Sequence, residues 1–245
     1  MKSIVSFVLL ALLVLSQANC GSKKSEVDAN SNANASGGAG VDASARAEAQ
    51  RLLDQGNELA RQDRDKEASE LYQKAIALYP EFGEAHLKLA MSYDVLDQKK
   101  EAEEEYKKAT EAYQKYVREN SKDARAFFNM GLAYNKLAKA DDAVRAFRQA
   151  ATLDPENSDY QYELGLAYAK AARYQESVNA LQKASDLDPD NYRAQDELEK
   201  AKIDLQRWQS MVRQQEAVAK KQADKDKKDA NTNAGGTTAP SPEIH

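Results

Sequence analysis

The chain has 245 residues, of which 42% are hydrophobic and 31% charged, and its formal net charge at pH 7 is −5. This length allows one large or two small domains. The negative balance argues against a nucleic-acid partner, since such proteins carry a basic stripe on a basic domain. Aspartates interrupt the Lys-rich stretch 220–228, which we interpret as a solvated segment.

The first 19 residues have the three zones of a secretory signal peptide. Lys2 precedes an apolar run over 4–15, and small and polar residues follow up to Asn19. The run is too short to span a bilayer, which takes about 20 residues. We therefore predict that residues 1–19 direct export and are then removed.

Cys20 follows this segment directly and is the single cysteine of the chain. It cannot form an internal disulfide, and a free exposed thiol is a liability in an oxidising compartment. The layout resembles that of a bacterial lipoprotein, in which the cysteine is acylated and the next segment, here 20–44, is a disordered tether. The resemblance implies a membrane-anchored protein that faces the periplasm, and Gly21 favours the outer membrane by the family's sorting rule.

The residues before the cysteine leave a second interpretation open. Lipoproteins usually have Leu three residues before the cysteine and a small residue directly before it, whereas this chain has Gln17 and Asn19. Ordinary cleavage after Ala18 would instead release a soluble protein.

A period of 34 residues runs through the middle of the chain. The matching positions include Gly131 and Gly165, Ala143 and Ser177, Phe147 and Leu181, Ala150 and Ala184, and Pro155 and Pro189. The period predicts pairs of antiparallel helices, in which small residues allow close approach and a proline ends each second helix. The predicted N-caps of the helices that follow are Asp123, Asn157 and Asn191.

This pattern resembles the tetratricopeptide repeat (TPR) family, which implies an all-α solenoid of four helix-turn-helix repeats. The repeats cover 49–82, 83–123, 124–157 and 158–191. Apolar residues at three- and four-residue spacing then predict a capping helix over 192–216, with Trp208 packed against repeat 4. The folded domain is thus expected over 45–216, and the polar tail 217–245 is expected to be disordered.

Repeat 2 is seven residues longer than the others. Seven residues are close to two helical turns, so the insertion predicts a longer second helix whose apolar face stays in line. The extra turns are either a neutral extension or a contact ridge that includes Tyr113 and Tyr116.

The sequence offers no set of residues for catalysis. Its two histidines are His86 in repeat 2, which we expect to be packed or half-exposed and not a ligand, and His245 at the chain end. One histidine in the fold cannot build a zinc site or a catalytic triad with the residues available. We expect no catalytic residue, no metal, no cofactor and no small-molecule substrate.

By resemblance to the TPR pattern, certain positions of each first helix face a concave groove. The candidate partner-binding residues are Leu53, Asn57, Leu87, Met91, Arg125, Phe128, Leu132, Asn135, Lys136, Tyr162, Leu166 and Lys170, and the groove positions also include Ala60, Arg61 and Val95. The apolar members predict a continuous strip with basic flanks, which suits a peptide or helix with apolar anchors and some negative charge.

These observations predict a non-enzymatic scaffold or adaptor of the bacterial cell envelope. It would bind segments of other proteins in the groove and so support assembly of an envelope complex. The alternative is a soluble periplasmic carrier that holds exported proteins in a chaperone-like manner, and cleavage after Ala18 would favour it.

Overall fold

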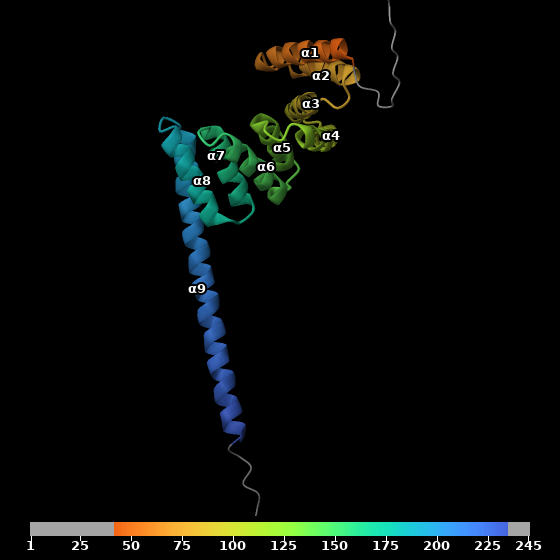
Figure 1. The fold of residues 1–245 in the computed structure, drawn as a ribbon. Coiled ribbons are helices and arrows are strands. Elements are labelled where there is room, and N and C mark those ends of the chain that lie inside the picture. The colour runs from red at the N-terminus through yellow and green to blue at the C-terminus, as the bar shows by residue number, and fades with distance from the viewer. Residues whose placement is uncertain (1–41, 235–245) are drawn as a thin grey trace, which may run out of the picture. The chain divides into compact units, whose positions relative to one another are not determined.

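The computed structural model describes residues 42–234, which contain nine α-helices and no strand (Figure 1). The all-α solenoid expected from the sequence is confirmed for this part of the chain. The helices are α1 (Ala43–Arg61), α2 (Asp65–Leu78), α3 (Gly83–Val95), α4 (Lys99–Glu119), α5 (Ala124–Lys136), α6 (Ala140–Leu153), α7 (Ser158–Lys170), α8 (Tyr174–Leu187) and α9 (Tyr192–Ala234). The predicted signal peptide, Cys20 and nearly all of the predicted tether lie outside the described residues.

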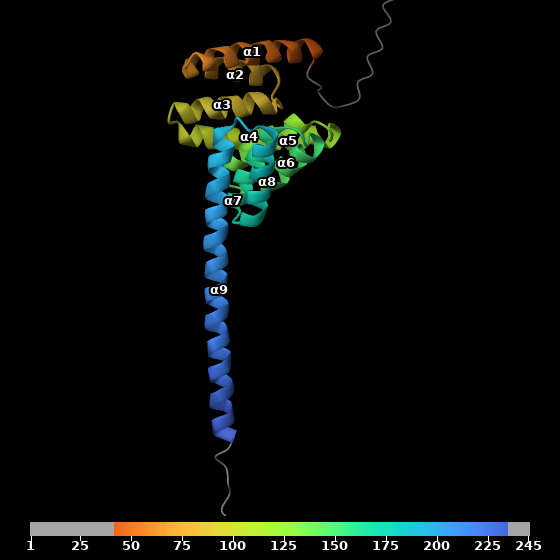
Figure 2. The same cartoon turned by 90° about the vertical axis from the view of Figure 1, so that its left-hand side faces the viewer.

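Consecutive helices pair as hairpins and each hairpin packs on the next (Figures 1 and 2). The pairs are α1 with α2, α3 with α4, α5 with α6 and α7 with α8, while each second helix also contacts the first helix that follows. The three N-cap residues predicted from the sequence each accept a backbone N–H at the start of a helix. Asp123 accepts the N–H of Ala126 at 3.0 Å, Asn157 that of Tyr160 at 3.1 Å and Asn191 that of Ala194 at 3.2 Å.

Small residues bring the two helices of a hairpin into contact. A Cβ atom on Gly131 would lie 2.7 Å from the ring of the fully buried Phe147, and one on Gly56 would lie 2.5 Å from the ring of Tyr72. Such distances leave no room for any side chain at the two glycines. The close approach inferred from the repeat is therefore confirmed.

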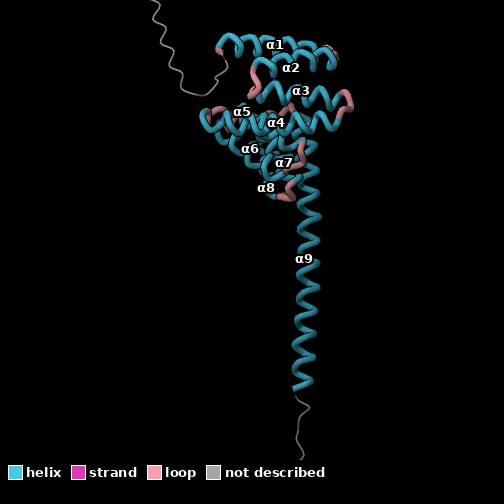
Figure 3. Tube along the Cα trace, turned by 90° about the vertical axis from the view of Figure 1, so that its right-hand side faces the viewer, coloured by secondary structure: helices cyan, strands magenta, loops and turns pink. Residues whose placement is uncertain are grey.

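Short turns join the two helices of each hairpin (Figure 3). Each contains a non-glycine residue with a left-handed backbone, and these are Asp63, Asp97, Ala138 and Ala172, all with φ of 55° or 56°. This conformation costs an L-residue about 1 kcal/mol. It was not predictable from the sequence, because glycine is absent from these positions.

Helix α4 has 21 residues, whereas α2, α6 and α8 have 14 each. The seven extra residues of repeat 2 therefore lengthen its second helix, as predicted. Tyr113 in the added turns is buried and Tyr116 is exposed.

Helix α9 is much longer than predicted, because it continues past residue 216 to Ala234. Its first turns cap the stack as expected, with Ala194, Leu198 and Ala201 buried against repeat 4. Trp208 lies 6.4 Å from the ring of Tyr174 and is 44% exposed. The prediction of disorder for 217–234 is wrong, since it equated the lack of a core-facing stripe with the lack of a helix. No helix within residues 42–234 combines the length and the apolarity needed to cross a bilayer.

Candidate partner-binding surface

The expectation that Leu53, Leu87 and Tyr162 line an open groove is wrong. Leu53 is 0% exposed and Leu87 is 2% exposed, and Tyr162 is also buried. Each belongs to an apolar cluster formed with neighbouring helices. These side chains hold the repeats together and present no surface to a partner.

The predicted apolar strip is also interrupted in its second half. Phe128 packs with its ring 4.8 Å from that of Tyr160 and 5.6 Å from that of Phe147. Leu132 and Leu166 are likewise half-buried against the core clusters. The continuous strip of the sequence analysis is therefore absent from the described residues, and Met91 alone among its apolar members is exposed.

The predicted basic residues Arg125, Lys136 and Lys170 form hydrogen bonds within the stack. Three hydrogen bonds connect neighbouring first helices: Arg125 to Glu84 at 2.6 Å, Lys136 to Asp94 at 2.8 Å and Lys170 to Asn135 at 2.6 Å. Because they lie at the surface, each contributes at most about 1 kcal/mol. Their common role is to link one repeat to the next.

An open groove does exist, between α1, α3 and the start of α5. It is a cavity of about 410 Å³ whose walls include Asn57, Ala60, Arg61, Lys88, Met91 and Val95. Met91 is 40% exposed and Val95 is 69% exposed. Asn57 is fixed there because its side-chain oxygen accepts the hydroxyl of Tyr72 at 2.9 Å, and burial raises the pKa of that hydroxyl to about 12. Val95 was a groove position in the repeat pattern but not a predicted anchor.

A second pocket, of about 320 Å³, lies where the added turns of α4 meet the starts of α3 and α5. Four aromatic side chains line it: Tyr79, Phe82, Tyr113 and Tyr116. We call these residues, with Asp123, the aromatic pocket. Sequence analysis identified Tyr113 and Tyr116 as a possible contact ridge but did not predict a cavity beside them.

Carboxylates shape the electrostatics of the aromatic pocket. Burial raises the pKa of Tyr113 strongly, and the negative charge of Glu84 adds to the effect. Burial also raises the pKa of Tyr116, together with the hydrogen bond of 3.0 Å that its hydroxyl donates to Asp123. The pocket therefore combines aromatic walls with three carboxylates, those of Glu81, Glu84 and Asp123, and with one cation, Arg125.

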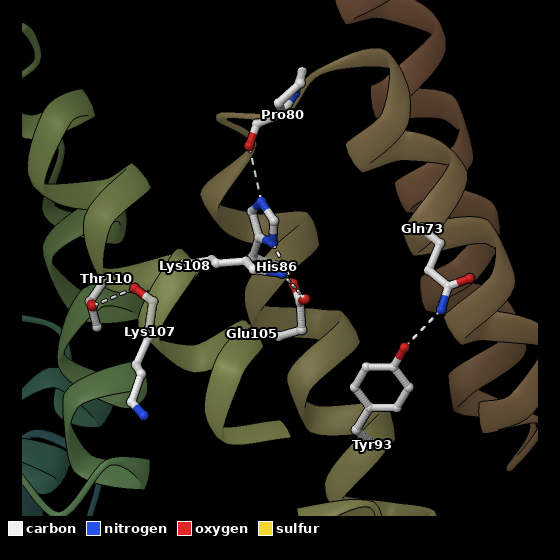
Figure 4. A network of polar contacts seen from close by, with 8 residues as sticks. All are labelled: Gln73, Pro80, His86, Tyr93, Glu105, Lys107, Lys108 and Thr110. Carbon is white, nitrogen blue, oxygen red and sulfur yellow. Dashed lines mark hydrogen bonds and ion pairs between the residues drawn. The ribbon is translucent and has the colours of Figure 1, made fainter. Parts of the chain in front are cut away.

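His86 is buried, which decides between the packed and the half-exposed position left open by the sequence, and its ring belongs to a polar network (Figure 4). Its Nδ1 lies 2.5 Å from a carboxylate oxygen of Glu105, and its Nε2 lies 3.0 Å from the carbonyl oxygen of Pro80. Both ring nitrogens of His86 therefore have a polar partner inside the protein. Within the described residues, no three His, Cys, Asp or Glu side chains are grouped so as to hold a metal ion.

Comparison with known families and structures agrees with this architecture. The model of the tetratricopeptide repeat family matches residues 53–117, 101–157 and 128–192, which together span more than half of the chain. Comparison with curated proteins gave no match.

Two solved structures illustrate the likeness. One is PilF of Pseudomonas aeruginosa, which is 20% identical with a TM-score of 0.52, over 67% of this chain and 72% of PilF. The other is a thermophilic TPR protein of Thermus thermophilus, which is 19% identical with a TM-score of 0.50, over 64% of this chain and 82% of that one. At these identities the likeness concerns the fold.

Proposed function

Because the chain belongs to the tetratricopeptide repeat family, we propose that it is a scaffold of the bacterial cell envelope that binds a segment of a partner protein in the groove around Met91 and Val95. TPR proteins serve in protein–protein interactions and bind peptide segments, and their fold is typically a non-catalytic scaffold. The family thus supports the kind of function, and the groove supports its location on this chain.

The exposed apolar side chains of the groove carry the proposal. Met91 and Val95 lie one helical turn apart on α3, and both are open to solvent at the wall of a concave surface. A methionine adapts its shape to different partners, and an apolar side chain of a partner would bury both residues. The same walls hold Arg61 and Lys88, which can pair with acidic residues of the segment, and also Asp65.

The envelope location rests on the N-terminal sequence. The segment 1–19 has the zones of an export signal, and Cys20 directly after it is placed for acylation. We expect the wild type to incorporate labelled fatty acid and Cys20→Ser not to do so. The variant should also shift to the soluble fraction. Equal labelling of both proteins would refute the anchor without touching the groove.

The groove is tested by affinity capture from detergent-solubilised membranes. We expect a small set of partners to be recovered with the wild type and lost with Met91→Glu/Val95→Glu. The matched control is Ile203→Glu/Val218→Glu, which places the same charges on exposed apolar positions of α9. Equal recovery with the groove variant and the control would show that the groove is not the binding surface. A diffuse set of unfolded proteins would instead support the soluble carrier.

A further inference from the structure

The aromatic pocket is distinct from the groove and owes its walls to the insertion in repeat 2. Tyr113 and Tyr116 both come from the turns of α4 that the shorter second helices lack. Tyr113 stands over the backbone of Gly83, where a Cβ atom would lie 3.2 Å from its ring. Asn129 donates a hydrogen bond of 3.0 Å to the Tyr113 hydroxyl and so fixes the ring at the inner end of the pocket.

The remaining aromatic walls come from the connection between α2 and α3. Tyr79 and Phe82 stack with their ring centroids 5.5 Å apart. The guanidinium of Arg46 already lies 5.1 Å from the centroid of the Tyr79 ring. One face of this stack thus supports a cation–π contact within the chain itself.

One carboxylate of the pocket has no basic partner among the described residues. Glu81 pairs with Lys115 at 2.8 Å, and Glu84 pairs with Arg125 at 2.6 Å. Asp123 instead receives the hydroxyl of Tyr116 and caps α5. Both of these donors are neutral, so its negative charge is not matched by a cation.

We propose that the aromatic pocket receives an arginine side chain of the partner segment, with the guanidinium between the tyrosine rings and Asp123. A guanidinium stacks on aromatic faces and pairs with a carboxylate through two parallel N–H donors, which suits both walls. An acidic side chain would face the unmatched charge of Asp123. An aliphatic side chain would desolvate that carboxylate and offer it no counter-charge.

This inference rests on the proposed function in that it assigns the side chain to a bound protein segment. The pocket lies along the same row of first helices as the groove, and Glu84 and Arg125 line both. A segment anchored by apolar residues at Met91 and Val95 would therefore carry its arginine toward the start of α3 and α5.

The test measures binding of N-acetyl-arginine amide to the intact protein by ligand-observed saturation-transfer NMR. The neutral isostere N-acetyl-citrulline amide and N-acetyl-glutamate amide are the comparison probes. We expect saturable binding of the arginine probe, with the strongest transfer to the methylene protons beside the guanidinium. Citrulline should bind at least about fivefold more weakly, because it loses both the cation–π contact and the ion pair.

Two variants locate the site. Asp123→Asn keeps a side-chain oxygen that can cap α5 but removes the charge, and Tyr116→Leu removes an exposed ring without opening the core. Each should weaken arginine binding by about fivefold or more. Glu111→Gln, an exposed acid on α4 outside the pocket walls, is the control and should leave binding unchanged.

Equal binding of the arginine and citrulline probes, or loss of discrimination only in Glu111→Gln, would overturn the assignment. Stronger binding of the glutamate probe would overturn it as well. The groove variant Met91→Glu/Val95→Glu should retain binding of the arginine probe. Equal partner capture by the groove variant and its control, with intact binding of the arginine probe, would therefore refute the groove and leave the pocket standing. Capture that depends on the groove, with no preference for the arginine probe, would refute the pocket and leave the groove standing.

Discussion

The contact between His86 and Glu105 gives the sharpest test of how repeat 2 is stabilised. We consider the substitution Glu105→Gln, which keeps the shape and one acceptor oxygen but removes the charge. Both side chains are nearly buried, and Lys108 also donates to Glu105, at 2.7 Å, from the solvent side (Figure 4). The variant therefore replaces the charged partner of the His86 ring by a neutral one in a poorly solvated place.

The magnitude follows from the two charged hydrogen bonds. A hydrogen bond to a charged group contributes about 1.5–3 kcal/mol when it is shielded from water. The contact with Lys108 counts for little because the lysine is half exposed. We therefore expect Glu105→Gln to lower the free energy of unfolding by about 2 kcal/mol at pH 7.

The pH dependence of this stability difference gives a second, independent test. Burial alone would raise the pKa of Glu105, but hydrogen bonds from His86 and Lys108 outweigh it and hold this pKa below the ordinary value of 4.5. A depressed carboxylate pKa stabilises the fold above the unfolded-state value, and this stabilisation is lost as the pH falls through the folded-state value. The difference between wild type and Glu105→Gln should accordingly shrink below pH 4.5.

The assay is urea unfolding followed by far-ultraviolet circular dichroism, at pH 7 and at a series of lower values. Glu103→Gln on the same helix is the control, since Glu103 is exposed and pairs only with Lys107 one turn away. It should leave the unfolding midpoint nearly unchanged. Equal midpoints for Glu105→Gln and Glu103→Gln at pH 7 would refute the reasoning.

Three further predictions concern other parts of the stack. Gly131→Ala should lower the free energy of unfolding by about 1 kcal/mol, because the clash with Phe147 exceeds the gain in helix propensity, and a urea midpoint at or above wild type would contradict this. Ala172→Gly should raise the free energy of unfolding by about 1 kcal/mol, because glycine adopts the left-handed backbone without strain. Ala171→Gly is the control, since Ala171 has a φ of −82° and gains nothing from glycine, and thermal unfolding distinguishes the two variants. Burial raises the pKa of Glu163, so ionisation of this side chain opposes folding. Glu163→Gln should therefore be more stable than wild type at pH 7, and this advantage should disappear as the pH falls through the folded-state pKa. Urea unfolding at several pH values measures the difference.

The repeat architecture was predictable because it depends on residue size at fixed spacing. Gly131 and Phe147 belong to one hairpin, and their counterparts Gly165 and Leu181 recur 34 residues later. A glycine opposite a bulky residue specifies a close helix contact wherever it occurs. The seven extra residues of α4 were predictable for the same reason, since two added turns keep the same face toward the core.

The candidate site was predicted less well because exposure is not a property of a residue type. Leu53, Leu87 and Met91 are all apolar residues at groove positions of first helices, yet the two leucines are buried and Met91 is exposed. The two leucines pack in apolar clusters with neighbouring helices, whereas Met91 belongs to none of these clusters, and the repeat pattern alone does not distinguish the two cases. The aromatic pocket was missed because its walls come from three separated segments, around Tyr79, Tyr113 and Asp123.

The length of α9 was missed for a different physical reason. Residues 217–234 contain no proline or glycine and are rich in Ala and Lys, which favour a helix without any core contact. Pairs one turn apart, such as Gln222 with Asp226 at 2.7 Å, add to this preference. Low hydrophobicity therefore excluded burial but not helix formation.

Because α9 is one continuous helix, its two ends lie farther apart than those of a flexible segment with the same number of residues. At 1.5 Å per residue its 43 residues span about 65 Å, whereas a flexible coil of equal length has a root-mean-square span of about 36 Å. A continuous helix also fixes direction, because each added residue turns the far end by about 100°. The helix is anchored at repeat 4, where Ala194 and Leu198 are buried, and it holds its distal end at a set distance from the stack. Adding or removing two residues would shift that end by only about 3 Å along the helix axis but rotate it by about 200° around the axis.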